Sequence, residues 1–357
     1  MSGRVLAAPL LLCCLLLAAD EPRRNGDAVL RRQVKRAVRA ALDYLAGHQD
    51  DDGAWKDIIG RRASNLYVGH YDKHVGVTAL ACLAFLAHGD SPGRGRYGEN
   101  LKKGLRFLLD NIDENGYISY SNSRMYSHAF ATLFLAEVYG QVRDEEVKKK
   151  LKKAVRAIER AQNKYGGWRY KPTSKDADIS VTVCQIMALR AARNAGVAVD
   201  TEVIEKAVKY VKESATRRGA FYYQTRDADG NRIISRTSLA LTAAGVVALQ
   251  GAGRYDCREV REGVRYLYNS FVVNSIPPSG HMRTTFTYFY AHYYAIQALY
   301  VTGGRRWRAW WRKISNELLR GQNEDGRWQD IVGPNYATAM AALILQIPNG
   351  YLPIFQR

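Results

Sequence analysis

Three stretches of the sequence share one pattern: Gln49-Asp50-Asp51-Asp52-Gly53-Ala54-Trp55, Gln162-Asn163-Lys164-Tyr165-Gly166-Gly167-Trp168 and Gln322-Asn323-Glu324-Asp325-Gly326-Arg327-Trp328. Three further segments keep only the glycine and a large apolar residue two positions later: Gly116/Ile118, Gly219/Phe221 and Gly280/Met282. Successive glycines of this series are 63, 50, 53, 61 and 46 residues apart. A period of about 55 residues accommodates two helices and two turns, so we predict six helical hairpins.

Each repeat contains two kinds of helix. The helix before the glycine is charged and amphipathic, as the helical spacing of Val34, Val38, Leu42 and Leu45 shows. The helix after the glycine is apolar almost all round and must be buried on every side. Six segments are predicted to form these inner helices: Val77–Ala87, Ala129–Val138, Val181–Ala192, Leu239–Leu249, Tyr288–Val301 and Ala337–Leu345.

Six buried helices alternating with six amphipathic ones predict an all-α fold, an (α/α)6 toroid with an inner ring of apolar helices inside an outer ring. An open helical solenoid is the alternative. The final segment, Ile347 to Phe355, is too apolar for a free tail, and we expect it to dock on the body of the ring. No linker composition divides the chain, so residues 20–357 are predicted to form a single domain.

The first nineteen residues have the pattern of an export signal. Arg4 precedes an apolar run, Ala7 to Leu17, and small residues lead to a cleavage position near Ala19. We therefore expect an exported protein, periplasmic or secreted; a lone membrane anchor is the alternative. The net charge of +19 lies largely on helix exteriors. It suits either a solvated outer face or attraction to acidic partners, such as an anionic membrane surface or polysaccharide. No nucleic-acid-binding motif is present, so we expect no nucleic-acid partner.

The Gln-x3-Gly-x-Trp pattern resembles the QW repeat of the squalene–hopene cyclase and protein prenyltransferase superfamily. The resemblance covers about residues 30–357, and the chain is also similar to bacterial single-toroid proteins with prenyltransferase/squalene oxidase repeats. It implies an α/α-toroid in which the glutamine bonds backbone groups at helix ends and the tryptophan packs between hairpins. It also implies a central cavity for an isoprenoid-like or other apolar ligand.

One segment resembles the acidic motif of type II terpene cyclases, Asp-x-Asp-Asp-Thr after a Gly-Gly-Trp. Here Trp168 is followed by Asp176-Ala177-Asp178-Ile179-Ser180, with Ile179 in place of the third acid. The resemblance implies that Asp178 protonates an alkene or epoxide and that Asp176 is its partner. The residues alone leave a second interpretation open, in which either aspartate caps the helix that begins there.

Polar and aromatic side chains at the beginnings of the inner helices are the further candidates for a binding site. In a toroid these positions gather at one end of the ring, where convergent polar groups typically form a ligand site. The candidates for substrate binding are His74, His128, Arg236, Tyr290, His292 and Tyr336. The tyrosine-rich fifth inner helix suits a wall that stabilises a cation or stacks on sugars, or else simply fills the core.

The sequence therefore leads to three functional hypotheses. The first is an exported terpenoid-cyclase-like toroid that binds an isoprenoid-like ligand, with cyclase or isomerase chemistry at Asp178 if it is an enzyme. The alternatives are a carbohydrate-processing (α/α)6 enzyme that acts on acidic glycans, and a non-catalytic binding or scaffold protein. The Asp-x-Cys zinc pair of the prenyltransferases is missing, and we expect neither a metal nor another cofactor.

Overall fold

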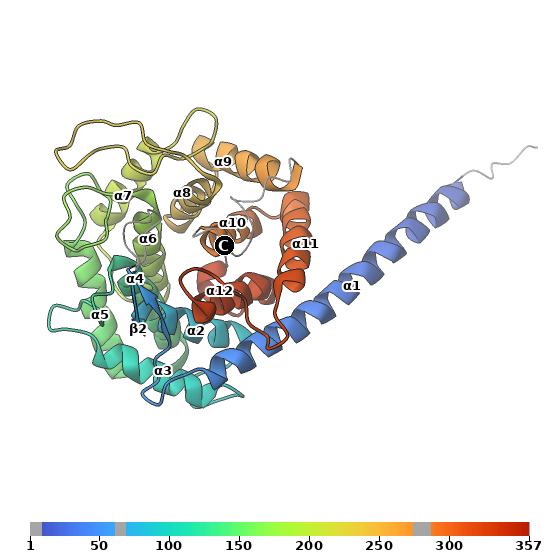
Figure 1. Ribbon diagram of the computed structural model, residues 1–357. Helices are drawn as coiled ribbons and strands as arrows, with labels where there is room; N and C mark the ends of the chain where they lie inside the picture. Colours follow the sequence, from blue (N-terminus) through green and yellow to red (C-terminus); the bar gives the residue numbers. More distant parts are fainter. Residues whose placement is uncertain (1–8, 61–68, 274–286, 357) are drawn as a thin grey trace, which may run out of the picture.

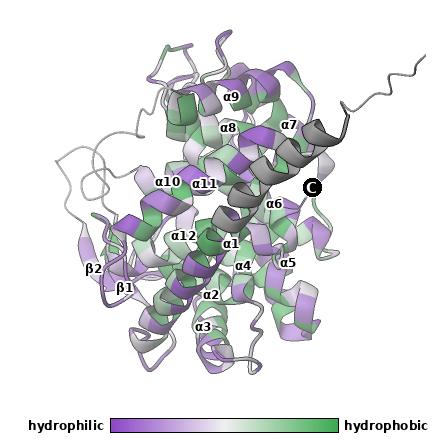
Figure 2. Ribbon diagram, turned by 90° about the vertical axis from the view of Figure 1, so that its right-hand side faces the viewer, coloured by the Kyte–Doolittle hydropathy of each residue, from purple (hydrophilic) through white to green (hydrophobic). Residues whose placement is uncertain are grey.

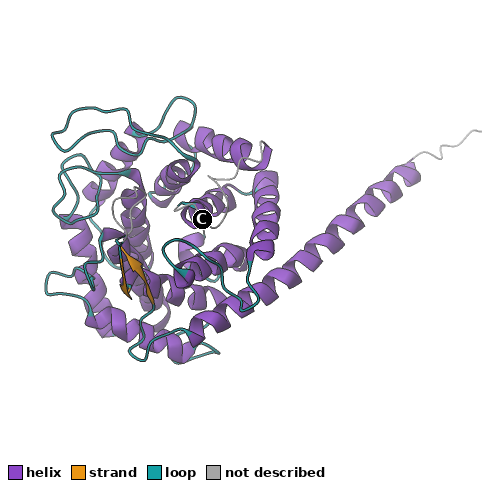
Figure 3. Cartoon of the chain, in the orientation of Figure 1, coloured by secondary structure: helices purple, strands orange, loops and turns teal. Residues whose placement is uncertain are grey.

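A computed structural model describes residues 9–60, 69–273 and 287–356. Twelve α-helices occupy most of these residues, and outer and inner helices alternate along the chain (Figures 1 and 3). The outer helices are α1 (Pro9–Gly47), α3 (Gly98–Asp110), α5 (Glu145–Arg160), α7 (Thr201–Glu213), α9 (Arg258–Tyr268) and α11 (Gly304–Gly321). The inner helices are α2 (Val75–His88), α4 (Met125–Val142), α6 (Ile179–Asn194), α8 (Leu239–Gly251), α10 (Tyr288–Thr302) and α12 (Pro334–Gln346).

The inner helices form a closed ring. Each packs against the next from α2 to α12, and α12 packs against α2. The outer helices cover this ring, and α1 contacts both α11 and α12, so the first and last hairpins meet (Figure 1). The predicted toroid is confirmed and the open solenoid is excluded. The predicted inner helices agree with the observed ones to within four residues at each end.

The repeat residues join each hairpin to its own turn and to the next hairpin. Trp328 donates its indole N–H to the Leu318 carbonyl at 2.9 Å, and its backbone N–H bonds the Thr338 hydroxyl of α12 at 3.1 Å. Gln322 donates to the carbonyls of Gly326 and Ala37 at 2.8 and 2.9 Å, which ties the last repeat to α1. In the copies that begin at Gln49 and Gln162, the glutamine likewise donates to its repeat glycine and to a carbonyl of the next outer helix, Asn100 of α3 or Val203 of α7. The tryptophans of these copies make the same two bonds within their own hairpins.

The repeat glycine is required by both conformation and close packing. Gly326 has φ +89°, and a β-carbon there would lie 2.5 Å from the Ala40 carbonyl oxygen of α1. Gly53 meets the Lys103 carbonyl of α3 in the same way, and Gly116, Gly166 and Gly219 each approach the following outer helix similarly. Only glycine combines a left-handed backbone with such an approach.

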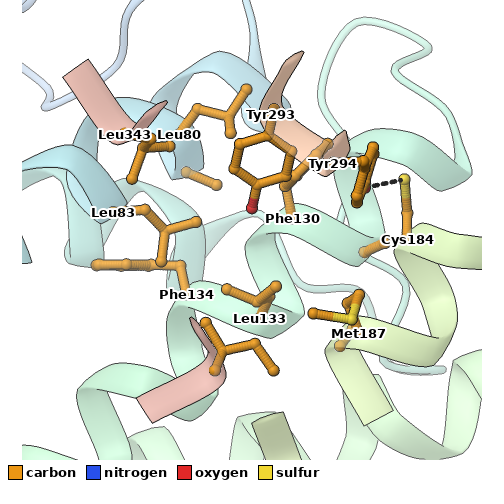
Figure 4. Close-up of a cluster of buried hydrophobic side chains, with 14 of the residues drawn as sticks. Leu80, Leu83, Phe130, Leu133, Phe134, Cys184, Met187, Tyr293, Tyr294 and Leu343 are labelled. Carbon is orange, nitrogen blue, oxygen red and sulfur yellow. Dashed lines mark hydrogen bonds between the residues drawn. The ribbon is translucent and has the colours of Figure 1, made fainter. Parts of the chain in front are cut away.

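The middle of the ring is filled with side chains from opposite helices. The rings of Phe130 on α4 and Tyr293 on α10 lie 6.0 Å apart, within a cluster to which α2, α6 and α12 also contribute (Figure 4). The C-terminal segment closes one end, as expected from its sequence. Phe355 packs 6.1 Å from the Tyr293 ring, and Arg190 of α6 donates to the Gln356 carbonyl at 2.6 Å.

A two-stranded hairpin was not expected from the sequence. Strands β1 (Lys56–Ile59) and β2 (His70–Lys73) pair antiparallel between the first repeat motif and α2. The hairpin lies in the connection between Trp55 and α2.

The surface of the outer helices follows the amphipathic pattern. Hydrophilic and hydrophobic residues alternate along the outer helices, as Figure 2 shows by colour. In the part of the chain that the structure describes, no helix is long and apolar enough to cross a lipid bilayer. The side chains of the expected signal segment, residues 1–19, lie outside the described set.

Candidate functional site

The candidate site lies where the inner helices begin. Because outer and inner helices alternate, all six inner helices begin at the same end of the ring, which we call the mouth. Four tyrosines meet there around Asp178, and we call them the tyrosine cluster: Tyr126, Tyr170, Tyr223 and Tyr290. They come from α4, from the segments before α6 and α8, and from α10.

Asp178 is fully buried and all its oxygen atoms are bonded. It is the N-cap of α6, accepting the Val181 backbone N–H on Oδ1 at 2.9 Å, as the capping interpretation predicted. The Ser180 hydroxyl donates to the same oxygen at 2.5 Å. On the other side, Arg169 donates to Oδ2 at 2.7 Å and the Tyr223 hydroxyl lies 3.4 Å away. The carboxyl therefore both begins a helix and faces the mouth.

Arg169 joins the two aspartates of the motif. Its Nε lies 3.0 Å from Asp176 Oδ2, while its guanidinium also bonds Asp178 and the Tyr223 hydroxyl. Gln224 donates to Asp176 at 3.1 Å. The two carboxyls are therefore held by a single cation on the same side of the mouth.

Burial and charge act on Asp178 in opposite directions. Burial has the larger effect and raises the pKa of the carboxyl above its ordinary value, whereas Arg169 and the bonds from Ser180 and Val181 lower it. Burial thus favours a bound proton, and the guanidinium stabilises the carboxylate that remains when the proton leaves. Such opposed influences are typical of functional acids.

The tyrosines are connected to Asp178 and to one another. The Tyr126 hydroxyl donates to Ser180 Oγ at 2.6 Å, and the Tyr290 hydroxyl to the Ser180 carbonyl at 2.9 Å. The hydroxyls of Tyr170 and Tyr223 lie 2.6 Å apart. Burial raises the pKa of Tyr126 and Tyr290 well above the ordinary value, so both remain neutral phenols. The mouth thus has aromatic faces beside one buried acid.

Two of the predicted binding residues also reach this region. The Arg236 guanidinium carbon lies 4.8 Å from the centre of the Tyr223 ring. Tyr336, in the first turn of α12, is close enough to Tyr290 to contribute to its raised pKa.

The three predicted histidines do not take part in the tyrosine cluster. His74 is the N-cap of α2, accepting the Gly76 and Val77 backbone N–H groups on Nδ1, and burial lowers its pKa to about 4. His128 accepts the Ile118 backbone N–H at 3.1 Å. In the repeats with a tryptophan at this position, a threonine hydroxyl accepts the tryptophan backbone N–H instead. His292 lies among the rings of Phe271, Tyr288 and Trp310.

Sequence reasoning missed Arg169, Tyr170 and Tyr223, although the repeat contains a signal for them. The second residue after the large apolar residue of each described repeat is aspartate or tyrosine. These five residues are Asp57, Tyr120, Tyr170, Tyr223 and Asp330. A comparison of that position across repeats would have identified Tyr170 and Tyr223 as candidate site residues.

Asp57 is a second fully buried carboxyl. Its Oδ2 accepts the Tyr336 backbone N–H at 2.6 Å, so a residue of β1 caps α12 across the junction between the first and last repeats. Its Oδ1 has no hydrogen-bond partner among the described residues. Burial raises the pKa of Asp57 to about 8.

The sequence matches one known protein family in part. Residues 126–276 match the family model of the squalene-hopene cyclase C-terminal domain. No curated protein matches the sequence.

Several solved structures share the whole toroid. The type II terpene cyclase MstE from Scytonema, without ligand, is 15% identical with a TM-score of 0.57, and the match covers 90% of this chain and 100% of that one. A variant of MstE in complex with its substrate, geranylgeranyl dihydroxybenzoate, is 14% identical with a TM-score of 0.61, over 90% and 99% of the chains. The GH76A α-1,6-mannanase from Salegentibacter sp. HEL1_6 is 12% identical with a TM-score of 0.59, over 88% and 98%.

Proposed function

Taking the chain as a single-toroid protein of the squalene–hopene cyclase type, we propose that its mouth binds an isoprenoid-like apolar ligand and that Asp178 protonates it. The observation that carries this proposal is the fully buried Asp178 carboxyl, bonded to Arg169 and surrounded by the tyrosine cluster. The similarity to MstE, whose substrate contains a geranylgeranyl group, supports the same ligand class.

The proposed chemistry is an acid-initiated cyclisation or isomerisation. The Asp178 carboxyl donates its proton to an alkene carbon, the π electrons form the new C–H bond, and the adjacent carbon becomes a cation. Arg169 and Ser180 then stabilise the Asp178 carboxylate, while the neutral rings of Tyr126 and Tyr290 stabilise the cation by about 0.5 to 2 kcal/mol each. Loss of a proton from the cation ends the reaction and restores the acid.

The structure limits where the ligand can lie. Phe130 and Tyr293 meet across the middle of the ring, and Phe355 packs beneath them. The ligand is therefore proposed to occupy the mouth rather than a shaft through the whole ring.

The carbohydrate alternative has less support, although the mannanase shares the fold. Glycosidases place two carboxyls on opposite sides of the scissile bond, about 5 to 9.5 Å apart. Here Asp176 and Asp178 are held by the same guanidinium on one side of the mouth.

The test of this proposal is the Asp178→Asn variant, because asparagine keeps an oxygen that can cap α6 and has no carboxyl proton to donate. Purified protein is incubated with geranylgeraniol or squalene, and the products are analysed by gas chromatography and mass spectrometry. We expect cyclised or isomerised products from the wild type and at least about a hundredfold less from Asp178→Asn.

The matched control is Asp144→Asn on outer helix α5. Asp144 caps that helix through the Val147 N–H at 2.9 Å, the same bond that Asp178 makes, but it lies outside the mouth. Asp144→Asn should retain wild-type turnover. Full turnover by a folded Asp178→Asn variant would refute the acid, and no binding of either lipid by the wild type would refute the ligand class.

We also propose that the mature chain is exported and begins near Asp20. Support comes from the charged start and apolar run of residues 1–19. The intact mass of the protein purified from its own host should correspond to a chain lacking these residues. A mass that still includes them would contradict cleavage.

A further inference from the structure

Two arginines at the mouth are available for a ligand. Arg124, half-buried at the beginning of α4, lies 5.9 Å from the centre of the Tyr170 ring. Arg236, exposed just before α8, lies 4.8 Å from that of Tyr223. Since the Tyr170 and Tyr223 hydroxyls are 2.6 Å apart, the two guanidiniums flank one pair of aromatic rings.

The carboxylates nearby are already paired with another residue. Arg169 lies over the same two rings, at 4.6 and 5.3 Å, and pairs with both Asp176 and Asp178. In the described part of the chain, the ion pairs within the mouth are made by Arg169 rather than by Arg124 or Arg236. The positive charges of Arg124 and Arg236 therefore have no carboxylate partner among the described residues.

The backbone adds to this positive potential. Helices α4, α6 and α8 begin side by side at the mouth, and helix N-termini have partial positive charge. Arginine is also suited to planar or tetrahedral oxyanions, because its donors match carboxylate and phosphate geometry.

We propose that the ligand carries an anionic head group, carboxylate or phosphate, which Arg124 and Arg236 bind while the apolar chain lies against the tyrosine cluster. This inference rests on the function proposed above. It adds that, among isoprenoids, an acidic or phosphorylated one binds more tightly than a hydrocarbon or an alcohol.

Isothermal titration calorimetry with three probes tests the inference. Farnesyl monophosphate contains both parts, farnesol has only the apolar chain, and inorganic phosphate is the anion alone. We expect the wild type to bind farnesyl monophosphate at least about tenfold more tightly than farnesol, the range expected for charge-assisted hydrogen bonds. Inorganic phosphate should bind far more weakly than either lipid.

The variants Arg236→Gln and Arg124→Gln/Arg236→Gln identify the residues responsible. The single variant changes an exposed side chain and should fold normally. Its preference for farnesyl monophosphate over farnesol should be smaller than that of the wild type, and the preference of the double variant should be smaller still. Arg232→Gln is the matched control, because Arg232 lies in the same loop and its side chain is 74% exposed. This substitution removes the same charge as Arg236→Gln. It should retain the full preference.

Each other outcome has a defined meaning. Equal binding of farnesol and its phosphate by the wild type would overturn the inference and leave the proposed function standing. The inference would also be overturned if inorganic phosphate bound as tightly as farnesyl monophosphate. The same holds if Arg232→Gln lost as much of the preference for farnesyl monophosphate as Arg236→Gln does. If neither lipid binds, the proposed function fails together with the inference.

Discussion

Asp57 and Asp178 show how the surroundings of a residue decide its role. Both are fully buried aspartates near the beginning of an inner helix. Asp178 has a guanidinium partner and was recognisable in the sequence because it lies in an acidic motif next to a repeat tryptophan. Asp57 has no cation partner among its described contacts, and its place at the start of α12 depends on ring closure. A residue 279 positions from its partner cannot be assigned from local sequence.

The raised pKa of the Asp57 carboxyl predicts that the stability of the folded chain depends on pH. Its pKa is about 8 in the folded chain and would be about 3.9 in the unfolded chain. The folded state therefore binds the proton more tightly, and its stability relative to an Asp57→Asn variant should fall as the pH rises from about 4 to 8. The fall is at most about 1.4 kcal/mol per pH unit.

Urea unfolding at several pH values measures this difference. Asp51→Asn changes an exposed aspartate in the neighbouring turn and should follow the wild type at every pH. Parallel pH profiles for the wild type and Asp57→Asn would contradict the role assigned to Asp57.

At the level of helices and turns, most of the architecture could be predicted because the signals are local and repeated. The apolar inner helices were located from residue periodicity, and the backbone bonds expected for the repeat glutamine are present at Gln322. The β1–β2 hairpin was missed because its pairing depends on a long connection rather than on periodicity. His74 and His128 accept backbone N–H groups, a use that the sequence alone does not distinguish from ligand binding, and their role in substrate binding stays a prediction.

The glycine of the last repeat provides a test of how the hairpins pack. Gly326→Ala should destabilise the chain both by its left-handed backbone, about 1 to 2 kcal/mol, and by the clash with the Ala40 carbonyl. Gly253→Ala is the matched control, because Gly253 has φ +80° but no atom within 4 Å of the added carbon. Chemical denaturation should show a larger loss for Gly326→Ala. Equal losses would mean that the close approach to α1 contributes nothing.

On the scale of the whole molecule, the ring closes but its centre is not an open shaft. The closure could be expected from the number of repeats, and the docking of the last residues from their apolar character. The central contact between Phe130 and Tyr293 could not, because it joins helices on opposite sides of the ring. The size and depth of a binding site in such a fold depend on these long-range contacts.

The C-terminal segment should contribute measurably to the stability of the ring. Phe355 is only 4% exposed and packs against Tyr293, so Phe355→Ala should cost about 3 to 5 kcal/mol in the free energy of unfolding. Tyr351 lies in the same segment but is 58% exposed, and Tyr351→Ala should change little. Similar unfolding curves for the two variants would show that the segment does not seal the ring.

The most direct measurement of the central claim is a crystal structure of Asp178→Asn soaked with geranylgeraniol, since this variant should bind the lipid without consuming it. The account predicts density for the lipid beside Tyr126 and Tyr290, with one alkene carbon about 3 to 3.5 Å from the side chain at position 178. Lipid density elsewhere on the molecule, or a mouth occupied only by solvent at saturating lipid, would contradict it.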